Sequence, residues 1–241
     1  KKSISRSGFI ALIVICSFFI LSDGIAWLAI IFYMFASSSI ISKILPQQQG
    51  IVQTIAKPGG RDYVQALANL GVSICLYAVY LLKPYDFLMI GFLASIIGAN
   101  ADSWASEIGR LSKKTPNLIT TFKPIKHGIS GGITMMGTFG GILGGLFIFL
   151  LSYFTLQNKN YEFLFTKRSI TVILVSGIAG LFIDSYLGAW FQALYQSKVG
   201  LNEKKEGQII KGFHWMTNDL VNFISTFLSA IFGMLLYLWF T

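Results

Sequence analysis

The sequence predicts an all-α, polytopic integral membrane protein of about seven transmembrane helices, with six as the alternative count. Three observations support this fold class. Hydrophobic residues make up 54% of the 241 residues and charged residues only 12%, whereas soluble domains carry roughly 25% charged residues. Several apolar stretches approach the roughly 20 residues that a helix needs to cross a bilayer. Backbone groups in lipid must bond within their own segment, so these stretches are predicted to be helices.

The candidate spans are the apolar runs between clusters of polar and basic residues. They cover 8–22, 24–42, 66–82, 87–101, 131–154, 169–196 and 219–240. The first and the fourth are short, and if one of them is re-entrant the count falls to six. No long polar linker divides the chain. We therefore expect a single integral membrane domain over residues 1–241.

The basic residues predict the orientation in the membrane. With seven spans, 15 of the 19 lysines and arginines fall on the side of the N-terminus and 4 on the other side. Cytoplasmic loops of membrane proteins collect lysine and arginine, so the N-terminus is predicted to be cytoplasmic and the C-terminus outside. The same rule accounts for the net charge of +9 without a nucleic-acid partner.

Four carboxylates lie near the predicted cytoplasmic ends of three spans. Asp102 and Glu107 follow the fourth span, Asp184 lies within the sixth, and Asp219 opens the seventh. A carboxylate within a span is costly and suggests a function, so we expect a shared site on the cytoplasmic side. The alternatives are a solvated helix end for the first two, an interhelical hydrogen bond for Asp184, and a favourable charge at a helix N-terminus for Asp219.

Small polar side chains accompany these carboxylates on the predicted helix faces. A regular helix turns Asp102 and Glu107 about 140° apart, so they hold one ion together only if the helix breaks between them. The candidate substrate-binding residues are Asn69, Asn100, Ser103, Ser106, Ser185, Gln192 and Asn222.

A glycine-rich segment, "KPIKHGISGGITMMG", is the candidate phosphate site. Backbone N–H groups at a glycine-rich helix start bind anions, and this segment passes through Ser130, Gly131 and Gly132 into the fifth span. Lys123 adds positive charge beside it. Arg61 is a further phosphate candidate because its planar fork matches phosphate oxygens, although an anchoring role at the membrane surface fits it equally well.

A second set of glycines has the spacing of helix packing. Small residues four positions apart let two helix backbones approach closely in a membrane. The residues with this spacing are Gly137, Gly140, Gly141, Gly144 and Gly145.

Five blocks of the sequence resemble a known family. They are "RDYVQALAN", "NADSWASEIG", "LITTFKPIKHGISGGITMMGTFGG", "DSYLGAWFQALY" and "NDLVNFIST", in that order, within residues 6–230. In these blocks the chain resembles the phytyl-phosphate kinase family of vitamin E biosynthesis. It has Ser103 where many relatives have threonine, and "IKHG" where relatives often have a proline-containing turn.

The resemblance implies transfer of a phosphoryl group from a nucleoside triphosphate, CTP being one candidate, to a lipid-like prenyl or phytyl monophosphate. Such transfer needs positioning, Mg²⁺ and positive charge around the moving group. Hard cations take oxygen ligands, so Asp102, Asp184 and Asp219 are the candidate metal ligands. Asp102, Glu107 and Asp184 are the candidate catalytic carboxylates. The prenyl chain length, the preferred nucleotide and the oligomeric state stay open.

Two other functions compete with the kinase. One is a membrane transporter or carrier of a phosphorylated lipid, and the other is a CTP-dependent lipid cytidylyltransferase. A transporter should have polar residues that reach both sides of the membrane, whereas this sequence keeps them on one side, which favours an enzyme. The two enzymes differ in their products, because a cytidylyltransferase attaches the nucleotide monophosphate to the lipid.

Overall fold

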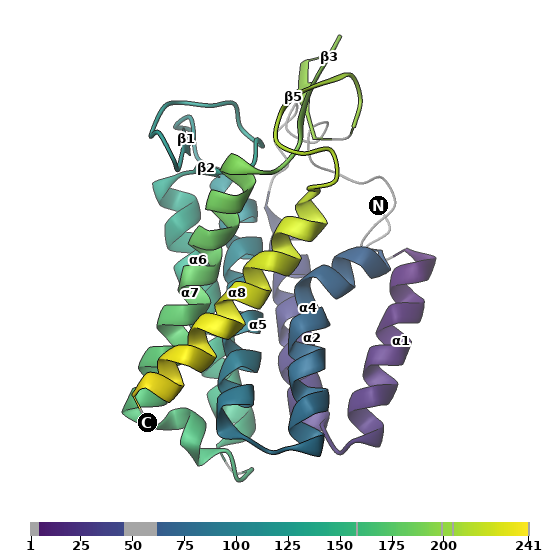
Figure 1. The fold of residues 1–241 in the computed structure, drawn as a ribbon, viewed down its shortest axis with the longest axis vertical. Coiled ribbons are helices and arrows are strands. Elements are labelled where there is room, and N and C mark those ends of the chain that lie inside the picture. Colours follow the sequence, from purple (N-terminus) through teal and green to yellow (C-terminus); the bar gives the residue numbers. More distant parts are fainter. Residues whose placement is uncertain (1–4, 46–61, 158, 199, 204, 241) are drawn as a thin grey trace.

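The computed structural model describes residues 5–45, 62–157, 159–198, 200–203 and 205–240 as a helical bundle with short strands at one end (Figure 1). Seven α-helices lie within these residues. They are α1 (Arg6–Leu21), α2 (Ile25–Ile44), α4 (Tyr63–Leu82), α5 (Asp86–Gly109), α6 (Met135–Leu156), α7 (Lys167–Trp190) and α8 (Asn218–Trp239). A short 3-10 helix, η1 (Glu162–Phe165), precedes α7.

Six of these helices, all except α1, are long and apolar enough to cross a membrane, whereas α1 has 16 residues. Successive helices alternate in direction, so the start of α1 and the end of α8 lie at opposite ends of the bundle (Figure 1). The predicted polytopic helical fold is therefore confirmed. The largest differences from the predicted boundaries lie in three helices: α5 continues to Gly109, α6 begins only at Met135, and α7 already ends at Trp190.

Most of the helices begin at a side chain that caps them. A cap side chain accepts a hydrogen bond from a backbone N–H group in the first turn, where the helix itself offers no acceptor. Asp62 and Gln65 form a reciprocal capping box at the start of α4. The other side-chain caps are Ser5, Thr134, Thr166 and Thr217.

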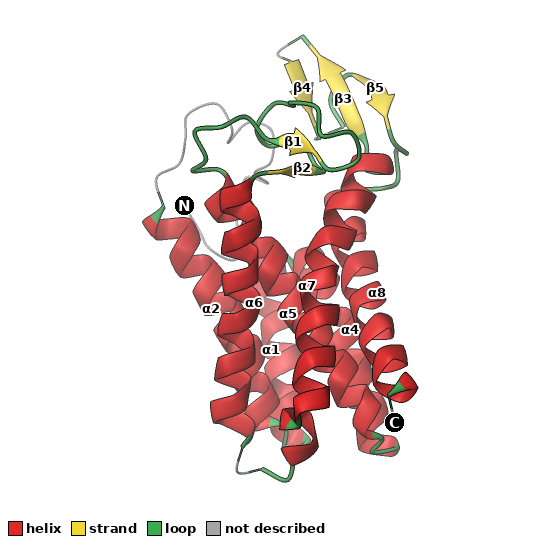
Figure 2. Cartoon of the chain, turned by 90° about the vertical axis from the view of Figure 1, so that its left-hand side faces the viewer, coloured by secondary structure: helices red, strands yellow, loops and turns green. Residues whose placement is uncertain are grey.

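The strands form two small antiparallel sheets at the same end of the bundle (Figure 2). β1 (Asn117–Leu118) pairs with β2 (Gly132–Ile133), and the other sheet has the order β4 (Gly200–Asn202), β3 (Leu194–Ser197), β5 (Gln208–Lys211). From the sequence, these segments are predicted to be loops or ends of spans, because strands this short show no period-2 alternation of apolar and polar residues. We call this end of the bundle the strand end.

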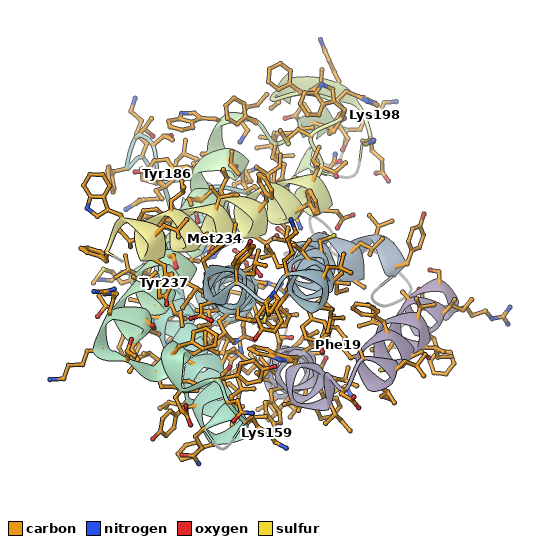
Figure 3. All side chains as sticks on the ribbon, turned by 60° about the horizontal axis from the view of Figure 1, so that its bottom comes forward. Phe19, Lys159, Tyr186, Lys198, Met234 and Tyr237 are labelled. Carbon is orange, nitrogen blue, oxygen red and sulfur yellow. The ribbon has the colours of Figure 1, made fainter. Side chains whose placement is uncertain are left out.

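Helix α5 lies at the centre of the bundle. Every residue from 88 to 101 is buried, and α2, α4, α6, α7 and α8 all pack against this helix. A second part of the core joins α1, α2 and α4 through aromatic rings, with Phe19 stacked on Tyr77 at 4.7 Å between ring centroids. Figure 3 shows Phe19 among the packed side chains between helices, whereas Lys159 and Lys198 lie at the periphery.

The glycines of α6 face α5, as their spacing predicts. All five are buried. A Cβ atom added at Gly141 would lie 2.9 Å from the backbone oxygen of Ala101, and one at Gly144 would lie 2.7 Å from the ring of Trp104. The packing prediction for these glycines is confirmed, because a side chain larger than hydrogen would push α6 away from α5.

We expect Gly141→Ala to lower the stability of the protein in detergent by roughly 1–3 kcal/mol, the usual cost of overpacking a core. Gly71→Ala is the matched control. Its added Cβ would lie 3.4 Å from the ring of Phe223, an ordinary contact, and alanine favours a helix over glycine by up to about 1 kcal/mol. Thermal unfolding of both variants tests this. Equal melting temperatures would contradict a close approach at Gly141.

Candidate functional site

A pocket of about 150 Å³ lies at the strand end of the bundle. The end of α5, the loop 127–134 with the first turn of α6, and α7 form most of its wall. Pro116, Glu203 of the β4–β5 connection and Asn218 of α8 complete it. From α5 the lining residues are Asp102, Ala105, Ser106, Gly109 and Arg110. These five positions recur with the spacing of one helix face.

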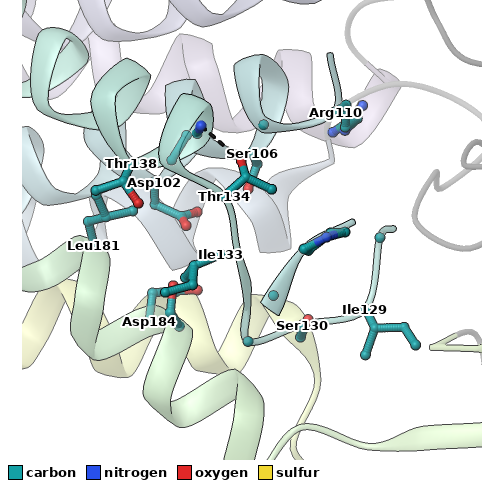
Figure 4. Close-up of a pocket in the computed structure, with 18 of the residues that line it drawn as sticks. Asp102, Ser106, Arg110, Ile129, Ser130, Ile133, Thr134, Thr138, Leu181 and Asp184 are labelled. Atoms are coloured by element: carbon teal, nitrogen blue, oxygen red, sulfur yellow. Dashed lines mark hydrogen bonds between the residues drawn. The ribbon is translucent and has the colours of Figure 1, made fainter. Parts of the chain in front are cut away.

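Two carboxylates from different helices face this pocket (Figure 4). Asp102 comes from α5 and Asp184 from α7, and they lie close enough for their charges to interact. Neither forms an ion pair with the part of the chain that the structure describes. Two like charges in one partly enclosed space repel each other, so a cation between them would be stabilised.

The Asp184 carboxylate is held from behind by α8. Ser225 Oγ donates a hydrogen bond to Asp184 Oδ2 at 3.0 Å. With its amide oriented to satisfy its neighbours, Asn222 Nδ2 donates to the same oxygen at 3.0 Å and to the backbone oxygen of Asn218 at 3.2 Å. These contacts leave Oδ1 of Asp184 available to the pocket.

The glycine-rich segment forms a loop and a strand rather than the start of the helix. Gly128 and Gly131 have φ angles of 86° and 85°, in the left-handed region that favours glycine. Helix α6 begins only at Met135, with Thr134 as its cap (Figure 4). Ser130, Gly131 and Gly132 line the pocket as predicted for phosphate-binding residues. The N-terminus of α6 contributes Thr134, Gly137 and Thr138 to the same wall.

Glu203 reaches this loop from the β4–β5 connection. Its Oε1 atom accepts a hydrogen bond from the backbone N–H of Ser130 at 2.8 Å, and its Oε2 atom accepts one from Gln192 Nε2 at 2.7 Å. Burial raises the pKa of Glu203, although these hydrogen bonds and the nearby Lys211 charge oppose the increase. Burial also lowers the pKa of Lys211, whose ammonium group donates to the backbone oxygen of Gly188 at 3.0 Å.

Arg110 supplies positive charge to the pocket wall. It follows the last residue of α5, and its Nη2 atom lies 3.3 Å from Glu107 Oε1. Its Nε atom is buried and has no hydrogen-bond partner among the described residues. A guanidinium with an unused donor beside a glycine-rich loop is suited to a phosphate oxygen. Arg110 is the only lysine or arginine among the lining residues that the structure describes.

The structure brings together part of the predicted site. The predicted residues that line the pocket are Asp102, Ser106, Ser130, Gly131, Gly132, Asp184 and Ser185. Gln192 and Asn222 lie behind the wall, where they hold Glu203 and Asp184. The predicted residues outside the lining are Asn69, Asn100, Ser103, Glu107, Lys123 and Asp219. Arg61 lies outside the described residues.

Helix rotation explains several of these outcomes. Each residue turns the helix by about 100°, so Ser106, four residues after Asp102, shares its face, whereas Ser103 and Glu107 point elsewhere. In the same way Asn218 lines the pocket and its neighbour Asp219 does not. The predicted set of three aspartates is therefore not assembled, and within the described ranges no three His, Cys, Asp or Glu side chains gather as metal ligands.

Two further predicted residues, Lys123 and Asn69, do not line the pocket. Lys123 is exposed in the turn before the glycine-rich loop. Asn69 donates to the backbone oxygen of Gln65 within α4 at 2.8 Å.

Asn100 joins three helices. It is fully buried, its Oδ1 atom accepts from Ser37 of α2 at 3.1 Å, and its Nδ2 atom donates to the backbone oxygen of Gly144 of α6 at 2.8 Å. A buried amide satisfied on both sides by neighbouring helices stabilises the bundle and is closed to a substrate.

Arg110, Glu203 and Thr134 were not predicted from the sequence to be site residues. In the sequence, Arg110 is one of many basic residues in loops, and its type alone does not distinguish it from the others. The two-residue strand β2 is too short to be predicted, so the start of α6 was predicted too early. Glu203 and Ser225 lie far along the chain from the groups that they contact. The only usable signal was the helical spacing of Arg110 from Asp102 and Ser106.

Comparisons with known proteins place these observations in a family. A family model described as integral membrane protein DUF92 matches residues 1–230. The chain is 32% identical over 180 residues to an uncharacterised membrane protein of Methanocaldococcus jannaschii. The aligned region covers 73% of this chain and 63% of that protein. This chain thus spans less than two thirds of that relative.

Two plant proteins are also similar. The chain is 29% identical over 255 aligned positions to Protein PGR of Arabidopsis thaliana, covering 95% of this chain and 88% of that protein. It is 27% identical over 218 positions to Protein VTE6, chloroplastic, of the same plant, covering 89% of this chain and 59% of that protein. No solved structure matches the chain.

We expect Asn100→Leu to destabilise the protein by roughly 1–2 kcal/mol, because it removes two interhelical hydrogen bonds and nearly conserves volume. Ser103→Ala on the same helix is the control, since Ser103 makes no side-chain hydrogen bond with the described residues. The melting temperature in detergent is the measurement. An unchanged melting temperature together with lost ligand binding would instead support the predicted substrate-binding role of Asn100.

Proposed function

This chain belongs to the family described as integral membrane protein DUF92, and on that premise we propose that it is a prenyl-phosphate kinase. In this proposal it transfers the γ-phosphoryl group of a nucleoside triphosphate to a lipid-like prenyl monophosphate. The observation that carries the proposal is one pocket whose lining combines Asp102 and Asp184 with Arg110 and a glycine-rich loop. The resemblance of the sequence blocks to the phytyl-phosphate kinase family supports the same chemistry.

The acidic pair fits a magnesium ion by its donor set. Mg²⁺ is usually held by one or two carboxylates together with substrate phosphates and water, and the pocket offers the oxygens of Asp102 and Asp184. When bound, Mg²⁺ would neutralise charge on the phosphate oxygens. Asp219 is not needed for this arrangement.

Other groups in the pocket lining fit the phosphates. Arg110 presents a planar guanidinium, and the loop through Ser130 and Gly131 presents backbone groups where a side chain on Gly131 would meet Ala189. The N-terminus of α6 adds the positive end of a helix dipole. Together these groups would hold two phosphate chains close to each other and orient them for transfer.

The reaction needs little covalent chemistry from the protein. An oxygen of the prenyl phosphate attacks the γ-phosphorus, the bond from that phosphorus to the β-phosphate oxygen breaks, and the products are the prenyl diphosphate and a nucleoside diphosphate. The acceptor phosphate is already ionised at neutral pH, so no strong general base is required. Arg110 would stabilise the charge that develops on the transferred group.

The position of the pocket suits a lipid and a water-soluble reactant. The strand end carries most of the basic residues that the structure describes: Arg6, Lys43, Arg110, Lys113, Lys114, Lys123, Lys126, Lys198, Lys205 and Lys211. The opposite end carries Lys83, Lys159, Lys167 and Arg168. By the positive-inside rule the strand end would face the cytoplasm, where nucleotides are available and a prenyl tail can stay in the bilayer.

We expect Asp102→Asn, Asp184→Asn and Arg110→Gln each to reduce phosphoryl transfer by roughly 100-fold or more, as removal of one preorganised electrostatic group does. The assay supplies purified protein with Mg²⁺, γ-labelled nucleoside triphosphates including CTP, and prenyl monophosphates of several lengths. Labelled lipid diphosphate is the readout. Lys123→Gln is the control, because Lys123 is exposed and lies outside the pocket.

The products separate the competing functions. A cytidylyltransferase would release pyrophosphate and leave γ-label off the lipid, and a carrier would move the lipid phosphate across vesicles without consuming nucleotide. Full turnover in both aspartate variants would refute the assignment of the acidic pair.

We further expect Ser225→Ala to raise the Mg²⁺ concentration for half-maximal activity roughly 10-fold, because loss of a group that orients a metal ligand costs 10–100-fold in affinity or activity. Thr226→Val is the control on the neighbouring residue, since its hydroxyl bonds to the backbone of Phe223 and lies near that of Ala68. A loss of activity that saturating Mg²⁺ does not restore would argue against this positioning role.

A further inference from the structure

The Glu203 carboxylate already accepts a hydrogen bond from a backbone N–H group that a bound phosphate would need. Its Oε1 atom accepts the hydrogen bond of the Ser130 backbone N–H at 2.8 Å, and both residues line the pocket. A carboxylate and a phosphoryl group present the same kind of acceptor, a negatively charged oxygen. Glu203 is thus an anion, supplied by the chain itself, in the place predicted to hold phosphate.

The loop under Glu203 is built for an acceptor at this position. Gly131 is held with a φ of 85°, and a Cβ atom there would lie 2.5 Å from Ala189 Cβ. The backbone next to Ser130 is therefore fixed against α7. Elsewhere in the pocket lining, Arg110 Nε is buried without a hydrogen-bond partner among the described residues.

Glu203 is held in place by groups outside the pocket. Gln192 Nε2 donates to its Oε2 atom at 2.7 Å, and the charge of Lys211 on β5 attracts it. Gln192 is almost fully buried, yet its Oε1 atom has no partner in the described part of the chain. The carboxylate also lies near Asp184, whose negative charge repels it. The hydrogen bonds therefore hold the Glu203 carboxylate in place, while its burial and the repulsion from Asp184 oppose this position.

We propose that Glu203 is a built-in occupant of a phosphoryl subsite at the Ser130 N–H, and that it leaves this subsite when a phosphorylated ligand enters. The inference rests on the proposed function, because it names the subsite for one phosphate of that reaction. A phosphoryl group carries more charge and more acceptor oxygens than a carboxylate, so it competes with Glu203 for the Ser130 N–H. The displaced Glu203 side chain then turns away from the loop.

The first test measures binding of inorganic pyrophosphate to the full chain in lipid nanodiscs with Mg²⁺. Glu203→Ala removes the competing carboxylate, and we expect it to bind pyrophosphate at least about 10-fold more tightly than the unmodified protein, the scale of one charge-assisted hydrogen bond. Glu203→Gln keeps the shape of the side chain and should show a smaller increase. Glu206→Gln, an exposed residue in the same connection, should leave the affinity unchanged.

Glu203→Asp separates occupancy from charge. It keeps the negative charge but is one methylene too short to reach the Ser130 N–H from the same backbone position. We expect its affinity for pyrophosphate to lie between those of the unmodified protein and Glu203→Ala. If Glu203→Asp binds pyrophosphate as weakly as the unmodified protein, and only the neutral variants bind it more tightly, the effect comes from charge alone. That result would overturn the inference.

The second test follows the movement directly by hydrogen exchange. We expect pyrophosphate to increase exchange in peptides covering 200–211 and to decrease it in peptides covering 127–134. In Glu203→Ala the first change should be absent, because the contact is already broken. Increased protection of 200–211 on binding would contradict displacement.

The outcomes distinguish this inference from the proposed function. If pyrophosphate binds and Glu203→Ala does not tighten it, the inference fails and the kinase proposal stands. If Glu203→Ala tightens binding but no labelled lipid diphosphate forms under any condition, the kinase proposal fails and the subsite stands. Absence of pyrophosphate binding in every variant overturns the inference.

Discussion

The close approach of neighbouring helices to α5 is the constraint on which the rest of the structure depends. Lipid provides little hydrophobic drive for helices to associate, so contact rests on packing and on hydrogen bonds. Gly98 of α5 lies against Gly180 of α7, and Gly141 of α6 lies against the backbone of Ala101. Ser229 of α8 donates toward backbone oxygens of α5 and α7. This packing fixes how the ends of α5 and α7 meet at the strand end.

Much of the fold and part of the site could be predicted from the sequence. The helices follow from the length of apolar runs, and the packing face of α6 follows from glycine spacing, because both are local properties. The family resemblance read from five blocks is confirmed by the family match. Asp102 and Asp184 were predicted to share a site because carboxylates beside apolar spans are rare, and the structure places both at one pocket.

The remaining features depend on contacts between distant residues. No local pattern shows that Glu203 reaches Ser130, 73 positions away. Nor does any local pattern show that the Asn100 amide forms its hydrogen bonds with α2 and α6. The strands are too short for an alternating pattern to appear, so the sequence predicts a helix start where the structure has a glycine-rich loop. The difference between Asn218 and Asp219 is a rotation of one residue, finer than the accuracy of a predicted helix boundary.

The neighbouring carboxylates of Asp102 and Asp184 serve the proposed reaction but lower the stability of the folded protein. Two partly buried like charges destabilise a folded chain that has no cation between them, so asparagine at either position relieves repulsion that the unliganded protein must tolerate. Libraries of this protein selected for heat resistance would then drift toward neutral residues at these two positions. A screen that rewards stability alone would therefore discard the two carboxylates that the proposed reaction needs.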